Sequence, residues 1–346
     1  MAERDLIRTL NAVASFKPEE RLLFSANHDD ILRGATTDVY FVRAYEVLRH
    51  VGRQDTAVVA EIFASAPGVC SGVEECLNLL RSQRVQVWAL DEGLEFGTRE
   101  VVMRIQGSYG AFGIYETALL GILASSSAWA TAARECKAAA GDKQVLSFGA
   151  RHVHPSVASV MDRAAIVGGA DGCSSVLGAA LLGRPASGTI PHAAALIVGD
   201  TVEVARAYDE SMPSDTPRVI LVDTFKDEAE ETLRVAAALR NRLQGVRLDT
   251  PSERGGVTAE LVREIRARLD QAGYQGVQIF VSGGLNPARI SDLLRTGADG
   301  FGVGSYISSA KPIDMTMDLK EVEGRPVAKR GRIPGLTPAP RLRQRL

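Results

Sequence analysis

The stretch RVILVDTFKDEAEETLRVAAALRNRLQGVRLDT, residues 218–250, decides the fold. Two short apolar runs, 218–224 and 245–250, flank a segment over 226–243 whose apolar residues recur with the period of a helix. A strand, a helix and a second strand in this order form the unit from which parallel sheets are built. The stretch therefore predicts a parallel sheet covered by helices.

The same alternation continues on both sides of this stretch. Thr258 and Gly273 mark the ends of a second helix, and Asn286 begins a third over 286–297. Regular alternation predicts an α/β fold, an incomplete or irregular α/β barrel of TIM type over residues 144–312, in preference to a Rossmann sheet. With the two runs above, the candidate strands are seven, the others being 144–151, 164–171, 186–190, 277–284 and 299–305.

The residues before the barrel follow a different pattern. Residues 1–33 predict a helical lead-in, and apolar runs at 56–64, 85–90 and 100–107 predict strands. An Ala-rich segment over 116–141 predicts a long helix closed by Gly141. We therefore expect an N-terminal α+β domain over 1–143. The basic, Pro-containing tail over 313–346 is expected to pack back on that domain or to be partly disordered.

Composition argues against several classes of function. The 346 residues are 45% hydrophobic, and 40 Lys and Arg balance 42 Asp and Glu, which disfavours a nucleic-acid partner. No apolar run approaches the roughly 18 residues needed to cross a bilayer, so a cytoplasmic protein without a membrane partner is expected. The four cysteines form no CxxC pair and predict reduced thiols.

Glycines and polar residues follow the candidate strands, at the edge where α/β barrels carry their active sites. Two glycine turns, 282–284 and 302–305, predict a phosphate-binding site of backbone N–H groups, because a Cβ would block the approach of the anion. The helix after Asn286 would add its positive end. The turns also fit ordinary strand-to-loop connections. The residues expected at this rim are Arg151, Asp171, Asp223, Arg247, Asp249, Ser282, Gly283, Gly284, Gly302, Gly304 and Ser305.

The charged residues of the rim have two interpretations. Arg247 and Asp249 alternate along one strand and share a face, which predicts either a bound ligand or an internal ion pair. Asp223, after a buried strand, is a candidate ligand for Mg²⁺ or sugar hydroxyls. His192 opens an apolar helix and is locally a helix-start residue. The His152 and His154 pair lacks a carboxylate at ligand spacing, so zinc is not expected.

Seven segments resemble, in order, those of nicotinate phosphoribosyltransferases and, more distantly, nicotinamide phosphoribosyltransferase. They are FGARHVHP, GGADGCSSVLGAALLG, ASGTIPHA, LVDTFKDE, VRLDTPSERGG, FVSGGLNPARI and FGVGSYI. The resemblance implies that the chain joins nicotinate to 5-phosphoribosyl 1-pyrophosphate. The products would be nicotinate mononucleotide and pyrophosphate, in NAD salvage. It further implies Mg²⁺ bound with the phosphoribosyl pyrophosphate, and coupled ATP hydrolysis.

The resemblance also implies roles for single residues. Arg247 would face the pyridine substituent, Asp249 the ribose hydroxyls or Mg²⁺, and ATP would phosphorylate His192. Tyr40 would stack on the base from the partner subunit, which implies a homodimer, or an oligomer of dimers, with shared sites. Further substrate contacts would come from Phe148, Arg151, Asp171, Ser175 and Asp223, and the 5′-phosphate would lie against Ser282, Gly283, Gly284, Gly302, Gly304 and Ser305.

Three alternatives stay open. Quinolinate phosphoribosyltransferase uses the same barrel and also decarboxylates its substrate, but usually presents more Arg and Lys for a dicarboxylate. The nicotinamide enzyme has an Asp for the amide where this chain has Ser175, so a carboxylate substrate is favoured. A catalytically silent nucleotide-binding barrel is disfavoured by the presence of Arg247 and Asp249 beside both glycine turns.

Overall fold

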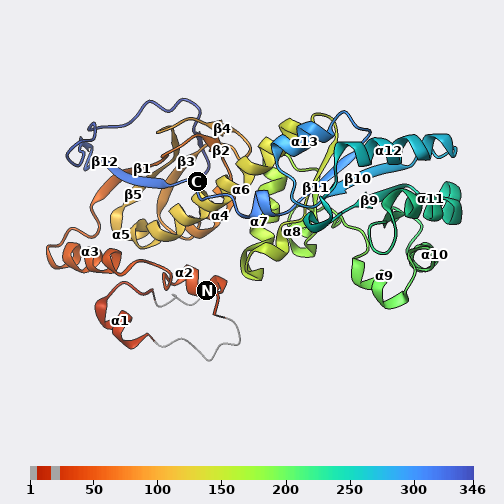
Figure 1. Cartoon of the computed structure of the whole chain (residues 1–346). Coiled ribbons are helices and arrows are strands. Elements are labelled where there is room, and N and C mark those ends of the chain that lie inside the picture. The colour runs from red at the N-terminus through yellow and green to blue at the C-terminus, as the bar shows by residue number, and fades with distance from the viewer. Residues whose placement is uncertain (1–5, 17–23) are drawn as a thin grey trace. The chain divides into compact units, whose positions relative to one another are not determined.

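The computed structural model describes residues 6–16 and 24–346 (Figure 1). The chain divides into two compact units, one formed by Met1–Ala130 with Lys311–Leu346 and the other by Thr131–Ala310. The division falls inside the long helix α6 (Glu116–Ala140). The first unit therefore draws on both ends of the chain.

A six-stranded antiparallel sheet forms the centre of the first unit, in the order β13-β12-β1-β5-β3-β14. Three of its strands confirm the apolar runs expected from the sequence: β1 (Ala57–Ala64), β3 (Val85–Ala89) and β5 (Val101–Ser108). The other three come from the C-terminal segment: β12 (Met315–Val322), β13 (Arg325–Pro326) and β14 (Arg343–Gln344). β1 pairs with β5 on one side and with β12 on the other, which joins distant parts of the chain.

Short elements complete this unit. The helical lead-in is present as α1 (Leu10–Ser15) and α2 (His28–Leu32), and the parts of it over 1–5 and 17–23 lie outside the described residues. The remaining helices are α3 (Val39–His50), α4 (Val73–Leu80), α5 (Tyr109–Phe112) and the 3-10 helix η1 (Gly113–Tyr115), and β2 (Gly68–Val69) pairs with β4 (Glu95–Phe96).

Helix α6 is the long helix expected over 116–141. It ends before Gly141, whose φ of 60° is a conformation that glycine adopts easily. The helical stretch Tyr109–Ala140 is long and apolar enough to cross a membrane by length and composition alone. This corrects the expectation that no run reaches such a length. Half of its most apolar window is buried within the protein, which also fits a core helix.

The second unit contains a six-stranded parallel sheet in the order β7-β6-β11-β10-β9-β8. Its first and last members, β7 and β8, do not pair with each other, so the curled sheet is an open barrel. This confirms the expected α/β fold with an incomplete barrel. The strands are β6 (Gln144–Ser147), β7 (Gly172–Cys173), β8 (Val219–Leu221), β9 (Gly245–Leu248), β10 (Gln278–Ser282) and β11 (Gly300–Val303).

Helices follow the strands as expected, and in Figure 1 α11 (Glu228–Leu239) and α12 (Ala259–Gln271) flank β9 and β10. The Thr258 hydroxyl accepts a hydrogen bond from the Leu261 amide at 3.2 Å, which confirms the N-cap of α12. Asn286 likewise caps α13 (Pro287–Leu293) by accepting from the Arg289 amide at 2.9 Å. The helix expected over 226–243 is shorter, because Arg240 has a φ of 53° and a 3-10 helix, η3 (Arg240–Arg242), follows.

Two of the seven expected strands are wrong. The run 164–171 is the last part of helix α7 (Pro155–Gly168), which ends at Gly169 with a φ of 116°. A short apolar run does not distinguish a buried strand from the buried face of a helix. The run 186–190 is not a strand either, although the Ser187 amide donates to the Cys173 carbonyl of β7 at 2.8 Å.

Three helices lie between β7 and β8 along the chain. They are α8 (Val176–Ala180), α9 (His192–Val198) and α10 (Thr201–Ser211). Because 186–190 lies between α8 and α9 without joining the sheet, its side chains reach the barrel interior from a loop. Thr189 is the example that bears on the site.

Candidate active site

Arg247, Asp249 and Ser282 form a hydrogen-bonded cluster at the carboxyl edge of the sheet. Arg247 lies on β9, Asp249 follows that strand, and Ser282 is the last residue of the neighbouring β10. The Arg247 guanidinium donates from Nε to Ser282 Oγ at 2.9 Å and from Nη2 to Asp249 Oδ2 at 2.8 Å. The Ser282 hydroxyl lies 2.8 Å from Asp249 Oδ1. Of the two alternatives weighed from the sequence, the structure shows the internal ion pair, and ligand binding by these residues stays a prediction.

The ion pair is only partly removed from solvent. The Arg247 and Asp249 side chains are each 17% exposed, so both charges stay accessible to a ligand. The third guanidinium nitrogen of Arg247, Nη1, donates to Thr189 Oγ1 at 3.1 Å. Sequence reasoning missed this role of Thr189, although the residue lies in the quoted segment ASGTIPHA. The sequence indicates only that Thr189 belongs to a turn, because a side-chain contact across the barrel leaves no local sequence pattern.

The Phe148 ring forms an aromatic wall beside Arg247. The Arg247 guanidinium carbon lies 5.2 Å from the ring centroid, which is within the range of a cation–π interaction. Gly302 makes room for this ring, since a Cβ built on Gly302 would lie 2.4 Å from Phe148 Cε2. A Cβ on Gly304 would lie 2.8 Å from His152 Cε1. These two glycines are therefore required by packing, whatever their contact with phosphate.

His192 and Asp223 form a second pair at the same edge. His192 begins α9, and its Nε2 lies 3.1 Å from Oδ2 of Asp223, which follows β8. Burial raises the pKa of the Asp223 carboxyl, while the hydrogen bond and charge of His192 oppose that shift. The Asp223 side chain is 1% exposed, and its Oδ1 is buried without a hydrogen-bond partner. A buried oxygen of this kind is available to a ligand.

The first glycine turn has the backbone conformation that the phosphate-binding hypothesis needs. Gly283 and Gly284 have φ values of 89° and 60°. A Cβ on Gly283 would lie 3.3 Å from Asp249 Oδ1, so this turn closely approaches the Arg247 cluster. Helix α13 after it has seven residues, and its Arg289 amide is already satisfied by Asn286. The expected contribution of the helix end is correspondingly small.

A cavity of about 520 Å³ runs through the barrel interior beside these residues. Its carboxyl-edge wall contains Phe148, Arg247, Ser282, Gly302 and Thr189. Apolar side chains form the deeper wall, among them Leu146, Val219 and Phe280. The cavity is thus polar where the cluster lies, apolar beside these side chains, and polar again towards the amino edge, where Gln144, Asp171 and Asp215 line it.

Five expected site residues lie outside the hydrogen-bonded cluster of Arg247, Asp249 and Ser282. Asp171 precedes β7 and binds Lys137 Nζ at 2.9 Å and the Val145 amide at 2.8 Å, at the amino edge of the sheet, although it also lines the cavity. The predicted position at a carboxyl edge is wrong, because the run 164–171 is the end of helix α7 and the turn after it, not a strand. Ser175 caps α8 by accepting from the Gly178 amide. Arg151 and Ser305 are exposed, in η2 (Ala150–His152) and at the start of α14 (Ser305–Ser308).

The fifth residue, Tyr40, belongs to the first unit. It lies on α3 and its side chain is 56% exposed. Its proposed contact with the base of a partner subunit stays a prediction. The roles predicted for the other site residues also stay predictions, whatever their positions.

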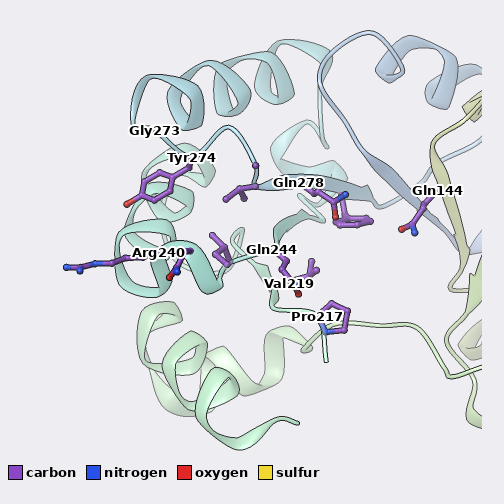
Figure 2. A pocket seen from close by; sticks show the side chains of 13 residues that line it. Gln144, Pro217, Val219, Arg240, Gln244, Gly273, Tyr274 and Gln278 are labelled. Carbon is purple, nitrogen blue, oxygen red and sulfur yellow. The ribbon is translucent and has the colours of Figure 1, made fainter. Parts of the chain in front are cut away.

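A second cavity, of about 580 Å³, lies at the opposite, amino edge of the sheet (Figure 2). Gln144, Gln244 and Gln278 line it together with Tyr274 and Arg240. In Figure 2 the Arg240 and Tyr274 side chains extend away from the pocket centre. The polar groups do not converge there as they do around Arg247.

Comparison with known proteins assigns the chain to a family. Residues 38–127 match the model "Quinolinate phosphoribosyl transferase, N-terminal domain", and residues 129–318 match the corresponding C-terminal domain. These matches place the chain in the structural class of phosphoribosyl transferases with a two-part fold and an open α/β barrel. The second match alone covers more than half of the chain. The chain belongs to the quinolinate phosphoribosyl transferase family.

Individual relatives agree with this class. The structure of a nicotinate-nucleotide pyrophosphorylase from Pyrococcus furiosus is 46% identical, with a TM-score of 0.87 over 91% of this chain and 82% of that one. A protein of the same name from Ehrlichia chaffeensis, 14% identical with a TM-score of 0.64 over 86% of this chain and 100% of that one, shares the fold. Nicotinate phosphoribosyltransferase pncB2 of Mycobacterium tuberculosis is 33% identical over 69% of this chain. This chain spans about half, 52%, of that relative's length.

The expected nicotinate phosphoribosyltransferase function is wrong on these findings. Both family models describe quinolinate phosphoribosyl transferase, whereas curated relatives named for nicotinate match at 33% identity or similar levels. The motifs that carried the resemblance are chiefly glycine turns and strand-end charges. Such residues indicate that the backbone can approach an anion closely. Enzymes that act on different pyridines share this property on the same barrel, so the motifs do not identify the pyridine.

Proposed function

We propose that this protein is a quinolinate phosphoribosyltransferase of NAD biosynthesis. It would transfer the 5-phosphoribosyl group of phosphoribosyl pyrophosphate to the nitrogen of quinolinate, with release of pyrophosphate and CO₂. The product is nicotinate mononucleotide. The observation that carries the proposal is the Arg247, Asp249 and Ser282 cluster beside Phe148, at the mouth of a cavity that also has apolar walls.

The first step forms the bond between the pyridine nitrogen and C1 of the ribose, and breaks the bond from C1 to pyrophosphate. Arg247 would bind the carboxylate that the product keeps, and Phe148 would lie against the pyridine ring. Asp249 supplies negative charge near the ribose, where positive charge develops in the transition state. Fixed placement of both substrates provides much of the rate enhancement.

The second step breaks the bond between C2 and the other carboxylate. CO₂ leaves, the electron pair stays on C2 beside the positively charged ring nitrogen, and a proton from water completes the product. An apolar environment favours this loss, because it destabilises the carboxylate more than it destabilises neutral CO₂. Leu146 and Phe280 supply such a wall in the cavity.

Mg²⁺ fits the second pair at the rim. Asp223 Oδ1 is buried and has no hydrogen-bond partner, and carboxylate oxygens are the ligands that Mg²⁺ prefers. Asp223, together with Asp249, would hold Mg²⁺ that arrives with phosphoribosyl pyrophosphate. The ion would neutralise the pyrophosphate as it leaves.

The test is a mass-spectrometric assay with phosphoribosyl pyrophosphate, Mg²⁺ and one pyridine at a time. Quinolinate carrying ¹³C in its 2-carboxyl group should give nicotinate mononucleotide and labelled CO₂ in equal amounts. Nicotinate and nicotinamide serve as the comparison substrates. The proposal would be overturned if nicotinate gave mononucleotide and quinolinate did not. It would also be overturned if none of the three pyridines gave a mononucleotide.

Parallel reactions with γ-labelled ATP test the ATP coupling predicted from the resemblance. Coupling requires acid-labile label on His192 and a faster reaction with ATP. For a decarboxylating enzyme, loss of CO₂ already drives the reaction forward, so ATP would be dispensable. If ATP does not change the rate and His192 carries no label, the hypothesis of ATP coupling is rejected and the proposed transferase activity is unaffected.

The homodimer and the cytoplasmic location are parts of the same proposal. Cys70, Cys76, Cys136 and Cys173 are all free and buried, which suits a reducing compartment. Phosphoribosyl pyrophosphate is a highly charged metabolite that does not cross membranes unaided. Sedimentation of the purified protein would test the dimer.

A further inference from the structure

Glu228 is a buried carboxylate at the carboxyl edge of the barrel that the proposed reaction does not use. It is the first residue of α11, and its side chain is 4% exposed. The Thr250 hydroxyl donates to Glu228 Oε1 at 2.8 Å, and Thr250 is itself buried. Thr250 directly follows Asp249 in the sequence. A hydrogen bond thus connects the start of α11 to the residue after Asp249.

The charge of Glu228 is balanced by the same loop. Removal of a carboxylate from water is unfavourable unless hydrogen bonds or cations compensate for it. Among the described residues, the cation within ion-pair distance of Glu228 is Arg254, whose Nε lies 3.5 Å from Oε1 and whose side chain is 61% exposed. Arg254 ends the 3-10 helix η4 (Ser252–Arg254), which follows β9. Glu228 therefore contacts the segment after Asp249 at two points.

The main chain of Thr250 lies in a closely packed position. A Cβ built on Gly283 would lie 3.8 Å from the Thr250 carbonyl oxygen and 3.3 Å from Asp249 Oδ1. A Cβ built on Gly256 would lie 4.0 Å from the same carbonyl oxygen. Close-packed interiors transmit displacements from one group to the next. A shift of Thr250 would therefore move Asp249, whose main chain it continues.

Asp249 lies just past the last residue of β9 that pairs with β10, which is Leu248. Its carboxylate is held by side chains on the two strands, Arg247 and Ser282. Its main chain has left the ladder, and the bond from Thr250 to Glu228 supplies the next anchor. The position of the Asp249 carboxylate thus depends on a helix as well as on the sheet.

We infer that Glu228 is a positioning residue for Asp249, because it holds Thr250 and so fixes the main chain at the end of β9. This inference rests on the proposed function, which places Asp249 beside the ribose. Glu228 does not touch the substrate in this arrangement and acts through Asp249. A carboxylate suits this task better than a neutral acceptor, since hydrogen bonds to an ionised oxygen are shorter and stronger.

The experiment compares Thr250→Val and Thr250→Ser, with Thr296→Val as the matched control. Thr296, in the turn before β11, is buried like Thr250, and its hydroxyl donates to a main-chain carbonyl. Thr250→Val should lower kcat about 10- to 100-fold, the scale for a displaced reacting geometry, while the KM for the pyridine changes little. Thr250→Ser keeps the donor and should recover most of the activity. Thr296→Val should keep the wild-type kcat.

A double-mutant cycle with Asp249→Asn separates positioning from packing. If Thr250 acts through Asp249, Thr250→Val should change the kcat of Asp249→Asn by no more than about 2-fold, because the group that it positions has already lost its charge. Glu228→Gln, whose amide oxygen can still accept from Thr250, should lower kcat less than Glu228→Ala does. The same cycle with Glu228→Ala applies if Thr250→Val does not fold.

The outcomes separate failure of this inference from failure of the proposed function. Equal fold losses from Thr250→Val in both backgrounds, or a wild-type kcat in folded Thr250→Val, would overturn the inference. The kinetics use whichever pyridine the wild type converts, since the proposed role of Asp249 is at the ribose. Conversion of nicotinate but not of quinolinate would reject the proposed function, and the cycle would still decide the role of Glu228.

A crystal structure of Thr250→Val gives a readout that needs no turnover. The Arg247 Nη2 to Asp249 Oδ2 contact, 2.8 Å in wild type, should be lengthened or lost. A cluster with this contact unchanged would overturn the inference, even if none of the three pyridines is converted.

Discussion

Arg247 commits three of its guanidinium N–H groups to the protein, one each to Ser282, Thr189 and Asp249. A guanidinium has five N–H donors, so two remain, and the proposed function assigns them to a substrate carboxylate. The three internal contacts fix the plane of the group before the substrate arrives, which reduces the entropy lost on binding. Asp249 is the charged member of this arrangement, and it also lies nearest to the Gly283 turn.

Replacing Asp249 with Ala should lower kcat/KM. The loss should correspond to about 2–4 kcal/mol of transition-state stabilisation, the scale for losing one charged contact in a closed site. Steady-state kinetics with both substrates measure the change. Asp249→Asn tests the charge with a smaller change of shape. Glu264→Gln, an exposed substitution on α12, is the matched control, and Tm values report whether each variant is folded. Turnover close to wild type in folded Asp249→Ala would reject the assignment.

At the level of elements, helix-capping residues predicted the structure better than short apolar runs did. Thr258 and Asn286 cap helices as expected, because a capping contact depends on residues three positions apart. The run 164–171 was misassigned, because its burial depends on packing against β6 and β7, which no local pattern records. The same error put Asp171 at the wrong end of a strand. Contacts between elements, such as the hydrogen bond from Arg247 to Thr189, could not be predicted from the sequence for the same reason.

Helix α6 begins with a carboxylate whose titration should affect stability. Burial, and next the charge of Asp318, raise the pKa of Glu116 to about 7, whereas Lys329 lowers it. A raised carboxyl pKa means that stability is fully present below the unfolded-state value and is lost as pH rises through about 7. The free energy of unfolding of Glu116→Gln should therefore be about 1–3 kcal/mol higher than that of wild type at pH 8. At pH 5 the two values should differ little.

Urea unfolding at these two pH values measures the Glu116 effect. Glu210→Gln, an exposed substitution on α10, is the control for a general change in charge. A Glu116→Gln variant that gains the same stability at both pH values would show that the gain comes from packing. It would contradict the expected titration.

For the whole molecule, the expected shared site predicts complementation between subunits. Tyr40 belongs to the first unit and Asp249 to the second, and in a shared-site dimer they would come from different chains. Inactive Tyr40→Ala mixed with inactive Asp249→Ala should then recover part of the activity, because some mixed dimers contain one intact site. The measurement is turnover after verified subunit exchange. Absence of recovery would show that each site is built from one chain.

The class of fold was predictable from the whole sequence, but the substrate was not. Alternating strands and helices over 144–305 predicted the barrel, and the glycine turns indicated its carboxyl edge as the candidate site. In the proposed site, discrimination between pyridines would depend on where a few donors lie around Arg247. Those positions are set by the loop over 186–190 and by packing against Phe148, so they appear only in three dimensions.

An open barrel carries a risk that a closed one avoids, because its two edge strands expose unpaired backbone groups to other chains. Here those edges are short: β7 has two residues and β8 has three. Pro217 lies just before β8 and has no N–H to offer an incoming strand. The Ser187 amide already occupies one carbonyl of β7. Both edges of the open barrel are thus poorly suited to pairing with a strand of another chain.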